Sequence, residues 1–311
     1  ACWLVLSRHG QRLRRLASDT QAMADGDFSR RAEPFGSEET IALELALDSL
    51  SERLRSVKAK ERENANLSSD LSAARNVQSC LLPARTAAIQ GLDIHSAYRP
   101  AREVGGDYYD FLPLDSRRMG LVVADVSGKS VPAALIMSTT RAMLRAVAPD
   151  NPSAAQVLSQ VNAMLAADIP KGMFVTACYM IIDPKGRSLL CASAGHTPLL
   201  VGRRDGRVEQ VAPGGIALGF DPGPVFQRSL REARLELEAG DRILAYTDGV
   251  VECQNPAKEE YSDRRLREFL RRNRALSSRD FVESLLADLD RHRGESEIHD
   301  DTTIVTFTLA E

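Results

Sequence analysis

Residues 120–138 read GLVVADVSGKSVPAALIMS, a stretch that changes from a strand pattern to a helix pattern within a few residues. The short apolar run Gly120–Ala124 predicts a buried β-strand, and the stretch Pro132–Ala148 predicts a helix. Asp125 lies at the edge of the predicted strand, beside a turn that contains Gly128. This segment therefore predicts a layered α+β domain with a carboxylate at the end of a core strand.

The same character extends from about Ala84 to the end of the chain, where short β-rich runs are punctuated by Gly, Pro and Asp. The predicted strands are Leu92–Tyr98, Asp107–Leu112, Gly120–Ala124, Phe174–Ile182, Ser188–Ser193, Arg234–Leu237, Arg242–Tyr246 and Thr303–Leu309. The predicted helices are Pro132–Ala148, Ser153–Ala167, Asp263–Arg272 and Ser278–Arg291. Hairpin signals at Pro184-Lys185-Gly186 and Arg204-Asp205-Gly206 favour antiparallel pairing. We expect an α+β fold with a central antiparallel β-sandwich flanked by helices.

Four segments place aspartates at the edge of a predicted strand. They are GGDYYD with Asp107 and Asp110, VADVSGK with Asp125, YTDGV with Asp248, and HDDTTIV with Asp300 and Asp301. Carboxylates at strand ends are well placed to point into one cleft, and Mg²⁺ and Mn²⁺ prefer oxygen ligands of this kind. Two such ions can activate a water molecule and clamp the oxygens of a phosphoryl group during in-line displacement.

Each aspartate taken alone has a simpler interpretation, because Asp beside Gly at a strand end is most often a turn residue. The joint pattern favours a metal site. The chain contains no G-x-S-x-G motif, no P-loop lysine motif and no cysteine in an obvious phosphate-binding loop. Hydrolysis by metal-activated water requires none of these nucleophiles.

Several segments in this order resemble the metal-dependent protein phosphatase family (PPM, type 2C), specifically its bacterial SpoIIE-like branch. They are ARNVQSCLLP, AREVGGDYYDF, VVADVSGKSVPAALIMS, SAGHTPLLV, LGF, LAYTDGVVE and HDDTTIV, and the resemblance covers about residues 70–309. It implies a PPM-type domain over residues 84–311 and a serine/threonine protein phosphatase activity. It also implies a phosphorylated protein substrate, typically a small anti-sigma-factor antagonist of the STAS type.

The resemblance assigns roles to four aspartates and one carbonyl group. Asp125 would bridge two Mn²⁺ or Mg²⁺ ions, with the backbone carbonyl of Val126 as a further ligand. Asp107 would bind one ion directly or through water, and Asp248 and Asp300 would complete the other site. A hydroxide that bridges the metals would then attack phosphoserine or phosphothreonine.

Two positions depart from the family pattern. The eukaryotic branch has a His, a proposed proton donor, shortly after the bridging Asp, whereas this chain has Ser127 at the corresponding place. The acid that protonates the leaving group therefore stays open, with a metal-bound water as one alternative. The glycine expected after Lys129 is Ser130; a positive φ there would cost about 1 kcal/mol without loss of the fold.

Three further polar residues have competing interpretations. Arg102 lies five residues before Asp107, a spacing like that of the phosphate-binding Arg of the eukaryotic branch, but it also fits a solvated charge at a strand end. His196 in SAGHTP is predicted to be structural, because a hard-metal site has little use for imidazole. Asp301 is the less favoured of the two adjacent aspartates as a metal ligand.

Residues 7–58 show the spacing of two helices that pair. Apolar positions step by three and four residues at Leu13, Leu16, Thr20 and Met23, and again at Leu43, Leu47, Leu50, Leu54 and Val57. The first helix should stop at Asp25-Gly26-Asp27, and Ser37 should cap the second. Two such helices resemble a HAMP signalling module, with a plain helical hairpin as the alternative. The resemblance implies a parallel homodimer.

The regions on either side of this module also predict helix. Residues 1–6 are read either as the cut cytoplasmic end of a transmembrane segment or as the start of a soluble helix. Residues 59–83 form a predicted coiled-coil linker that ends at Pro83. The 5 cysteines include no CxxC pair, which favours a reducing, cytoplasmic compartment. We expect the full-length protein to lie at the cytoplasmic face of the inner or plasma membrane, and this fragment to be cytoplasmic.

Charge and composition exclude some functions. The chain has 40 Lys and Arg against 43 Asp and Glu, so it lacks the overall basic field of a nucleic-acid-binding protein. One alternative is a catalytically inactive phosphatase fold that relays signals by binding a partner, but all four expected metal positions hold Asp. Another is a nucleotide cyclase, since GGD followed by aromatics superficially resembles GGDEF; the Glu is missing, and the other Asp motifs would be unexplained.

Overall fold

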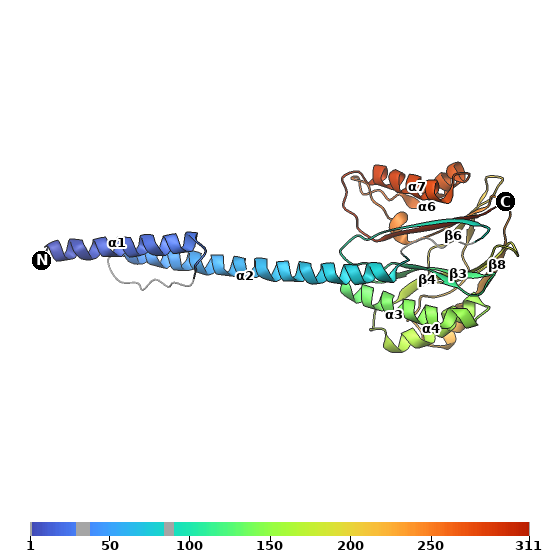
Figure 1. Ribbon diagram of the computed structural model, residues 1–311, viewed down its shortest axis with the longest axis horizontal. Helices are drawn as coiled ribbons and strands as arrows, with labels where there is room; N and C mark the ends of the chain where they lie inside the picture. The colour runs from blue at the N-terminus through green and yellow to red at the C-terminus, as the bar shows by residue number, and fades with distance from the viewer. Residues whose placement is uncertain (1, 29–37, 84–89, 311) are drawn as a thin grey trace. The chain divides into compact units, whose positions relative to one another are not determined.

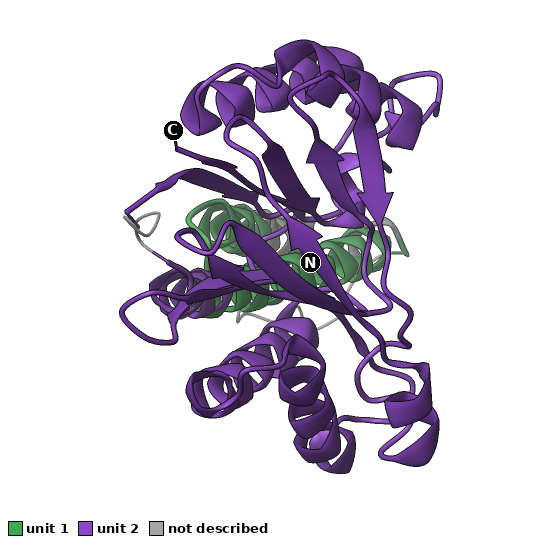
Figure 2. Ribbon diagram, turned by 90° about the vertical axis from the view of Figure 1, so that its right-hand side faces the viewer, with its two compact units in different colours: residues 1–70 green, residues 71–311 purple. Residues whose placement is uncertain are grey.

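The computed structural model describes residues 2–28, 38–83 and 90–310 of the chain. The chain separates into two compact units, residues 1–70 and 71–311 (Figure 2). The first unit consists of helix α1 (Cys2–Ala24) and the N-terminal part of helix α2 (Glu38–Leu81). Within the described residues, every helix is too short or too polar to cross a membrane.

Helix α1 ends where the sequence predicts. The backbone turns at Gly26, whose φ is 87°, and the amide of Asp27 closes the end by donating to the carbonyl oxygen of Ala22 at 2.9 Å. The predicted cap Ser37 and most of the connector lie outside the described residues. Helix α2 then continues unbroken to Leu81, because no Gly or Pro interrupts residues 38–82.

The second unit contains two sheets of five strands, and all neighbouring strands in them are antiparallel. The first sheet has the order β1 (Leu92–Arg99), β10 (Thr302–Leu309), β9 (Arg242–Tyr246), β6 (Leu199–Gly202) and β7 (Val208–Val211). The second has the order β2 (Tyr108–Pro113), β3 (Met119–Val126), β4 (Val175–Asp183), β5 (Ser188–Ala194) and β8 (Glu232–Glu236). The predicted α+β fold with antiparallel sheets is confirmed.

Strand β3 lies at the centre of a four-layer structure. Leu121 and Val123 belong to the apolar cluster between the two sheets, whereas Val122 and Ala124 belong to the cluster under helices α3 and α4. Helices α6 and α7 cover the opposite face of the first sheet (Figure 1). The helices of this unit are α3 (Val131–Val147), α4 (Ala154–Asp168), α5 (Pro224–Ser229), α6 (Ser262–Asn273) and α7 (Ser278–Arg293). A strand covered on both faces must be apolar throughout, which explains the unbroken run in β3.

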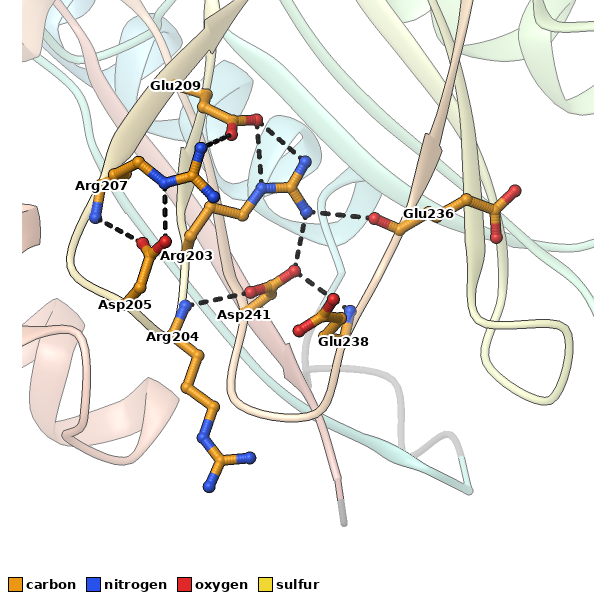
Figure 3. A network of polar contacts seen from close by, with 8 residues as sticks. All are labelled: Arg203, Arg204, Asp205, Arg207, Glu209, Glu236, Glu238 and Asp241. Atoms are coloured by element: carbon orange, nitrogen blue, oxygen red, sulfur yellow. Dashed lines mark hydrogen bonds and ion pairs between the residues drawn. The ribbon is translucent and has the colours of Figure 1, made fainter.

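The sequence analysis missed strands β6 and β7, although it predicted the turn between them at Arg204-Asp205-Gly206. Each strand has only four residues, too few to show a clear alternation. Arg203 anchors this hairpin by donating to Glu209 at 3.0 Å and to the buried Asp241 at 2.8 Å (Figure 3). Its Nη1 also donates to the carbonyl oxygen of Glu236 at the end of β8, so the network ties the edges of both sheets together.

Candidate functional site

The four acidic segments come from both sheets in two pairs. In the second sheet, Asp107 directly precedes β2 and Asp125 is the penultimate residue of β3. In the first sheet, Asp248 follows β9 in the short 3-10 helix η2 (Asp248–Val250), and Asp300 lies just before β10. Because these strands are antiparallel neighbours within each sheet, each pair lies at one end of its sheet.

The carboxylate of Asp107 joins the two pairs. Asp107 is 1% exposed, and its Oδ2 accepts hydrogen bonds from Thr247 Oγ1 at 2.8 Å and from Thr303 Oγ1 at 2.6 Å. The amide of Thr303 donates in turn to Thr247 Oγ1 at 2.9 Å. Burial, and then the charge of Asp125, raise the pKa of Asp107 well above its usual value. The sequence analysis missed both threonines, although each is close to a predicted Asp in YTDG and HDDTT.

Asp125 lies among other carboxylates. Burial, followed by the charges of Asp248 and Asp300, raises its pKa to about 7. A Cβ atom placed on Gly106 would lie 2.8 Å from the carbonyl oxygen of Val126 and 3.5 Å from Asp125 Oδ1. The carbonyl oxygen of Val126 and the carboxylate of Asp125 therefore lie next to the same small space. Only a glycine at position 106, which has no Cβ atom, leaves this space open.

Asp300 forms an ion pair that the sequence analysis did not foresee. Its Oδ2 lies 3.1 Å from Lys129 Nζ, and the same ammonium donates to the carbonyl oxygen of His299 at 2.5 Å. Asp248 has a raised pKa because it is buried and faces the charge of Asp300. Lys129 belongs to the loop between β3 and α3, so the pair connects loops of the two sheets.

Asp301 holds the loop before β2. Its Oδ1 accepts from the amide of Ala101 at 2.8 Å, and its Oδ2 accepts from the amide of Gly106 at 2.7 Å. Both carboxylate oxygens are thus engaged by backbone amides. This arrangement supports the preference for Asp300 as the ligand and makes Asp301 a residue that positions Asp107.

Gln78, near the end of α2, forms two hydrogen bonds to the same loop through its side-chain amide. Its Nε2 donates to the carbonyl oxygen of Gly105 at 2.7 Å, and its Oε1 accepts from the amide of Gly105 at 3.1 Å. Gln78 is buried, and a Cβ on Gly105 would lie 2.2 Å from both Asp301 Oδ2 and the Tyr98 hydroxyl. The sequence analysis included Gln78 only as part of the predicted coiled-coil linker at residues 59–83 and gave no reason to expect this contact.

The loop after Asp125 contains Ser127 and Ser130, the two residues that depart from the family pattern. Ser127 Oγ accepts from the amide of Phe174 at 2.8 Å, a structural contact between the loop and the start of β4. Ser130 has φ 72° and ψ −152°, which is the positive φ whose cost the sequence analysis considered. This region is almost restricted to glycine, and the strain costs about 1–3 kcal/mol. The exposed Arg102 has its Nη1 3.5 Å from Ser130 Oγ.

His196 contacts the strand next to the one that carries Asp125. Its Nδ1 is 2.9 Å from Thr176 Oγ1, and Thr176 pairs with Asp125 across β3 and β4. Burial lowers the pKa of His196 to about 4, so the ring is neutral near pH 7. These contacts fit the structural role that the sequence predicts.

The ligand atoms available at this site are all oxygens, which fits a hard divalent cation. Lys129 offsets part of the negative charge of the aspartates. In the part of the chain that the structure describes, no three His, Cys, Asp or Glu side chains are already grouped to hold an ion. Asp107 accepts from Thr247 and Thr303, Asp300 pairs with Lys129, and Asp301 accepts from backbone amides.

Comparisons with known proteins agree with this geometry. The sequence profile of the family described as Stage II sporulation protein E (SpoIIE) matches residues 115–310. The phosphoserine phosphatase RsbU of Bacillus subtilis is 27% identical over 78% of this chain and 70% of its own length. Protein IcfG of Synechocystis is 24% identical over 98% of this chain, which spans about half (52%) of IcfG. The SiaA-PP2C domain of Pseudomonas aeruginosa has the same fold, with a TM-score of 0.71 at 22% identity over 80% of this chain and 98% of that domain.

Proposed function

The chain belongs to the SpoIIE family of phosphatases with the PP2C fold, and we propose that it hydrolyses phosphoserine or phosphothreonine on a regulatory protein with the help of two Mn²⁺ or Mg²⁺ ions. The observation that carries this proposal is the contact of Asp107 with Thr247 and Thr303, which ties the start of β2 to the two segments of the first sheet that contain Asp248 and Asp300. A substrate of the STAS type is the finer proposal, and it rests on the resemblance of the sequence.

The ligands in this proposal are Asp107, Asp125, the carbonyl oxygen of Val126, Asp248 and Asp300. When bound, the ions would supply an activated water and offset charge on the phosphoryl oxygens. The protein's part is to orient the carboxylates: Thr247 and Thr303 both donate to one oxygen of Asp107, Oδ2. Arg102, whose Nη1 lies 3.5 Å from Ser130 Oγ, would bind the substrate phosphate.

The direct test is hydrolysis of para-nitrophenyl phosphate and of a phosphorylated STAS-type protein, each in EDTA, Mg²⁺ or Mn²⁺. We expect turnover only with a metal ion, and faster release of phosphate from the phosphoprotein than from an unrelated phosphoserine peptide. A folded protein that shows no turnover under any of these conditions would favour the inactive relay. Equal rates on the phosphorylated STAS-type protein and on the unrelated phosphoserine peptide would refute only the proposed preference for a STAS-type substrate.

The raised pKa of Asp125 predicts how the stability of the metal-free protein depends on pH. Its pKa is about 7 in the folded state because of burial and neighbouring carboxylates, and near 4 in the unfolded chain. Between these values the folded state holds a proton that the unfolded state has lost, so stability falls as pH rises. Asp125→Asn should therefore stabilise the protein in EDTA by about 2 kcal/mol or more at pH 8 and by little near pH 4.5. Urea unfolding at both pH values checks this, and an equal difference at both would contradict it.

Dimerisation is the proposed state of the N-terminal unit. Of the two predicted seams, the second lies on α2 and is partly open to solvent, with Leu43 and Leu50 48% exposed and Val57 53% exposed. A second copy would cover them in a parallel coiled coil. We expect Leu50→Asp to convert a dimer into a monomer in sedimentation velocity, whereas Lys60→Asp, at an exposed position of the same helix, should leave the dimer intact. A wild-type monomer would refute the proposal.

Control by the HAMP-like unit is proposed to act through Gln78. The side chain ties α2 to Gly105, two residues before Asp107, and its loss would leave buried peptide groups unpaired. Gln78→Ala should raise the Mn²⁺ concentration needed for half-maximal activity about tenfold, because the loop of Asp107 becomes less ordered. Asn76→Ala, at an exposed position of the same helix, is the control. An unchanged Mn²⁺ requirement in Gln78→Ala would rule out this route.

A further inference from the structure

Lys129 reaches across the candidate site from one sheet to the other. It lies in the loop that follows β3, and its ammonium contacts Asp300 Oδ2 at 3.1 Å and the His299 carbonyl oxygen at 2.5 Å. The side chains of Lys129 and Asp300 are 44% and 39% exposed. The pair is therefore accessible to ions from solution and is not locked in the core.

Lys129 places a positive charge beside the proposed metal ligands. Among the described residues, Lys129 is the one cationic side chain that forms an ion pair with any of Asp107, Asp125, Asp248 and Asp300. Without a positive charge here, these carboxylates would repel one another across the boundary between the sheets.

We propose that Lys129 is the resident counter-ion of the metal-free site, which occupies the carboxylate of Asp300 and gives it up when a divalent cation binds there. The inference rests on the proposed metal site. An ammonium at 3.1 Å from a carboxylate oxygen competes with a metal ion for the same lone pairs and repels its charge. Lys129 thus bridges the two sheets in the metal-free protein and sets a threshold for metal binding.

Removing this charge should have two opposite effects. Lys129→Met should bind Mn²⁺ about three- to tenfold more tightly, because no counter-ion has to be displaced. In EDTA the same variant should melt at a lower temperature than the wild type, because the carboxylates lose their positive partner. Lys129→Arg keeps a cation and should restore both properties to within about twofold in affinity and to near the wild-type melting temperature.

The experiment is a titration of each protein with Mn²⁺ at pH 7.5 and constant ionic strength, with free Mn²⁺ measured by electron paramagnetic resonance. Lys185→Met removes the same charge from an exposed turn between β4 and β5 and controls for net charge. Tighter binding in Lys129→Met alone supports the inference. Equal or weaker binding in that variant, with normal wild-type binding, overturns the inference and leaves the proposed function standing. A folded wild type that binds no Mn²⁺ overturns both.

Discussion

Asp125→Asn and Asp248→Asn are each expected to lower metal-dependent phosphatase activity by about a thousandfold or more. The two residues come from different sheets, Asp125 from β3 and Asp248 from η2 after β9. Each substitution keeps the size of the side chain and removes one negative charge from the proposed ligand set. A hard divalent cation binds neutral amides less tightly than carboxylates, so either loss should empty or displace an ion.

The rates should be measured with saturating Mn²⁺ on para-nitrophenyl phosphate and on a phosphoserine protein. Asp168→Asn, at an exposed position at the end of α4, removes the same charge away from the site and should retain full activity. Circular dichroism in EDTA should show both inactive variants folded, with Asp125→Asn more stable than wild type at pH 8. Retention of more than about a tenth of the activity by either variant would contradict the assigned ligands.

Gly249→Ala is the second substitution with a large expected effect. A Cβ at Gly249 would lie 1.9 Å from the carbonyl oxygen of Asp301 and 2.9 Å from its carbonyl carbon. Both atoms belong to the backbone leading into β10, which cannot move aside as a flexible side chain would. We expect a loss of about 3 kcal/mol or more in the free energy of unfolding, together with displacement of Asp248 and loss of activity.

Urea unfolding in EDTA measures this effect, with Gly223→Ala as the matched control. Gly223 has no atom within 4 Å of the position of an added Cβ, and its φ is −154°, so that variant should stay within about 0.5 kcal/mol of the wild type. If Gly249→Ala is as stable as Gly223→Ala, the backbone around η2 and β10 is more compliant than the structure indicates.

The elements that the sequence predicts well are those with long, uniform patterns. The unbroken apolar run of β3 indicates a strand covered on both faces, and the absence of Gly and Pro over residues 38–82 indicates one continuous helix. Strands β6 and β7 were missed because each has four residues, and β6 joins the sheet through β9, which is distant in the sequence.

The candidate site also contains residues that the sequence predicts and residues that it does not. The sequence predicts four aspartates at strand ends, because each stands in a local pattern of apolar run, turn and carboxylate. They are Asp107, Asp125, Asp248 and Asp300. The sequence does not predict the roles of Asp301 and Gln78, because their partners are backbone groups of the loop at residues 101–106. These backbone partners are 27 residues from Gln78 and 195 and 200 residues from Asp301, too far for a local pattern to identify.

The sequence by itself determined the α+β class, indicated metal-dependent chemistry through four aspartates at strand ends, and marked Ser130 as a position where a positive φ would be strained. Only the tertiary structure decided that Asp107 shares its carboxylate with Thr247 and Thr303, which are 140 and 196 residues away, and that Lys129 occupies Asp300. The physical reason is that hydrogen bonds and ion pairs of this kind depend on distances of about 3 Å between side chains. Such distances arise only when two separately formed sheets pack together, and neither periodicity nor composition records that packing.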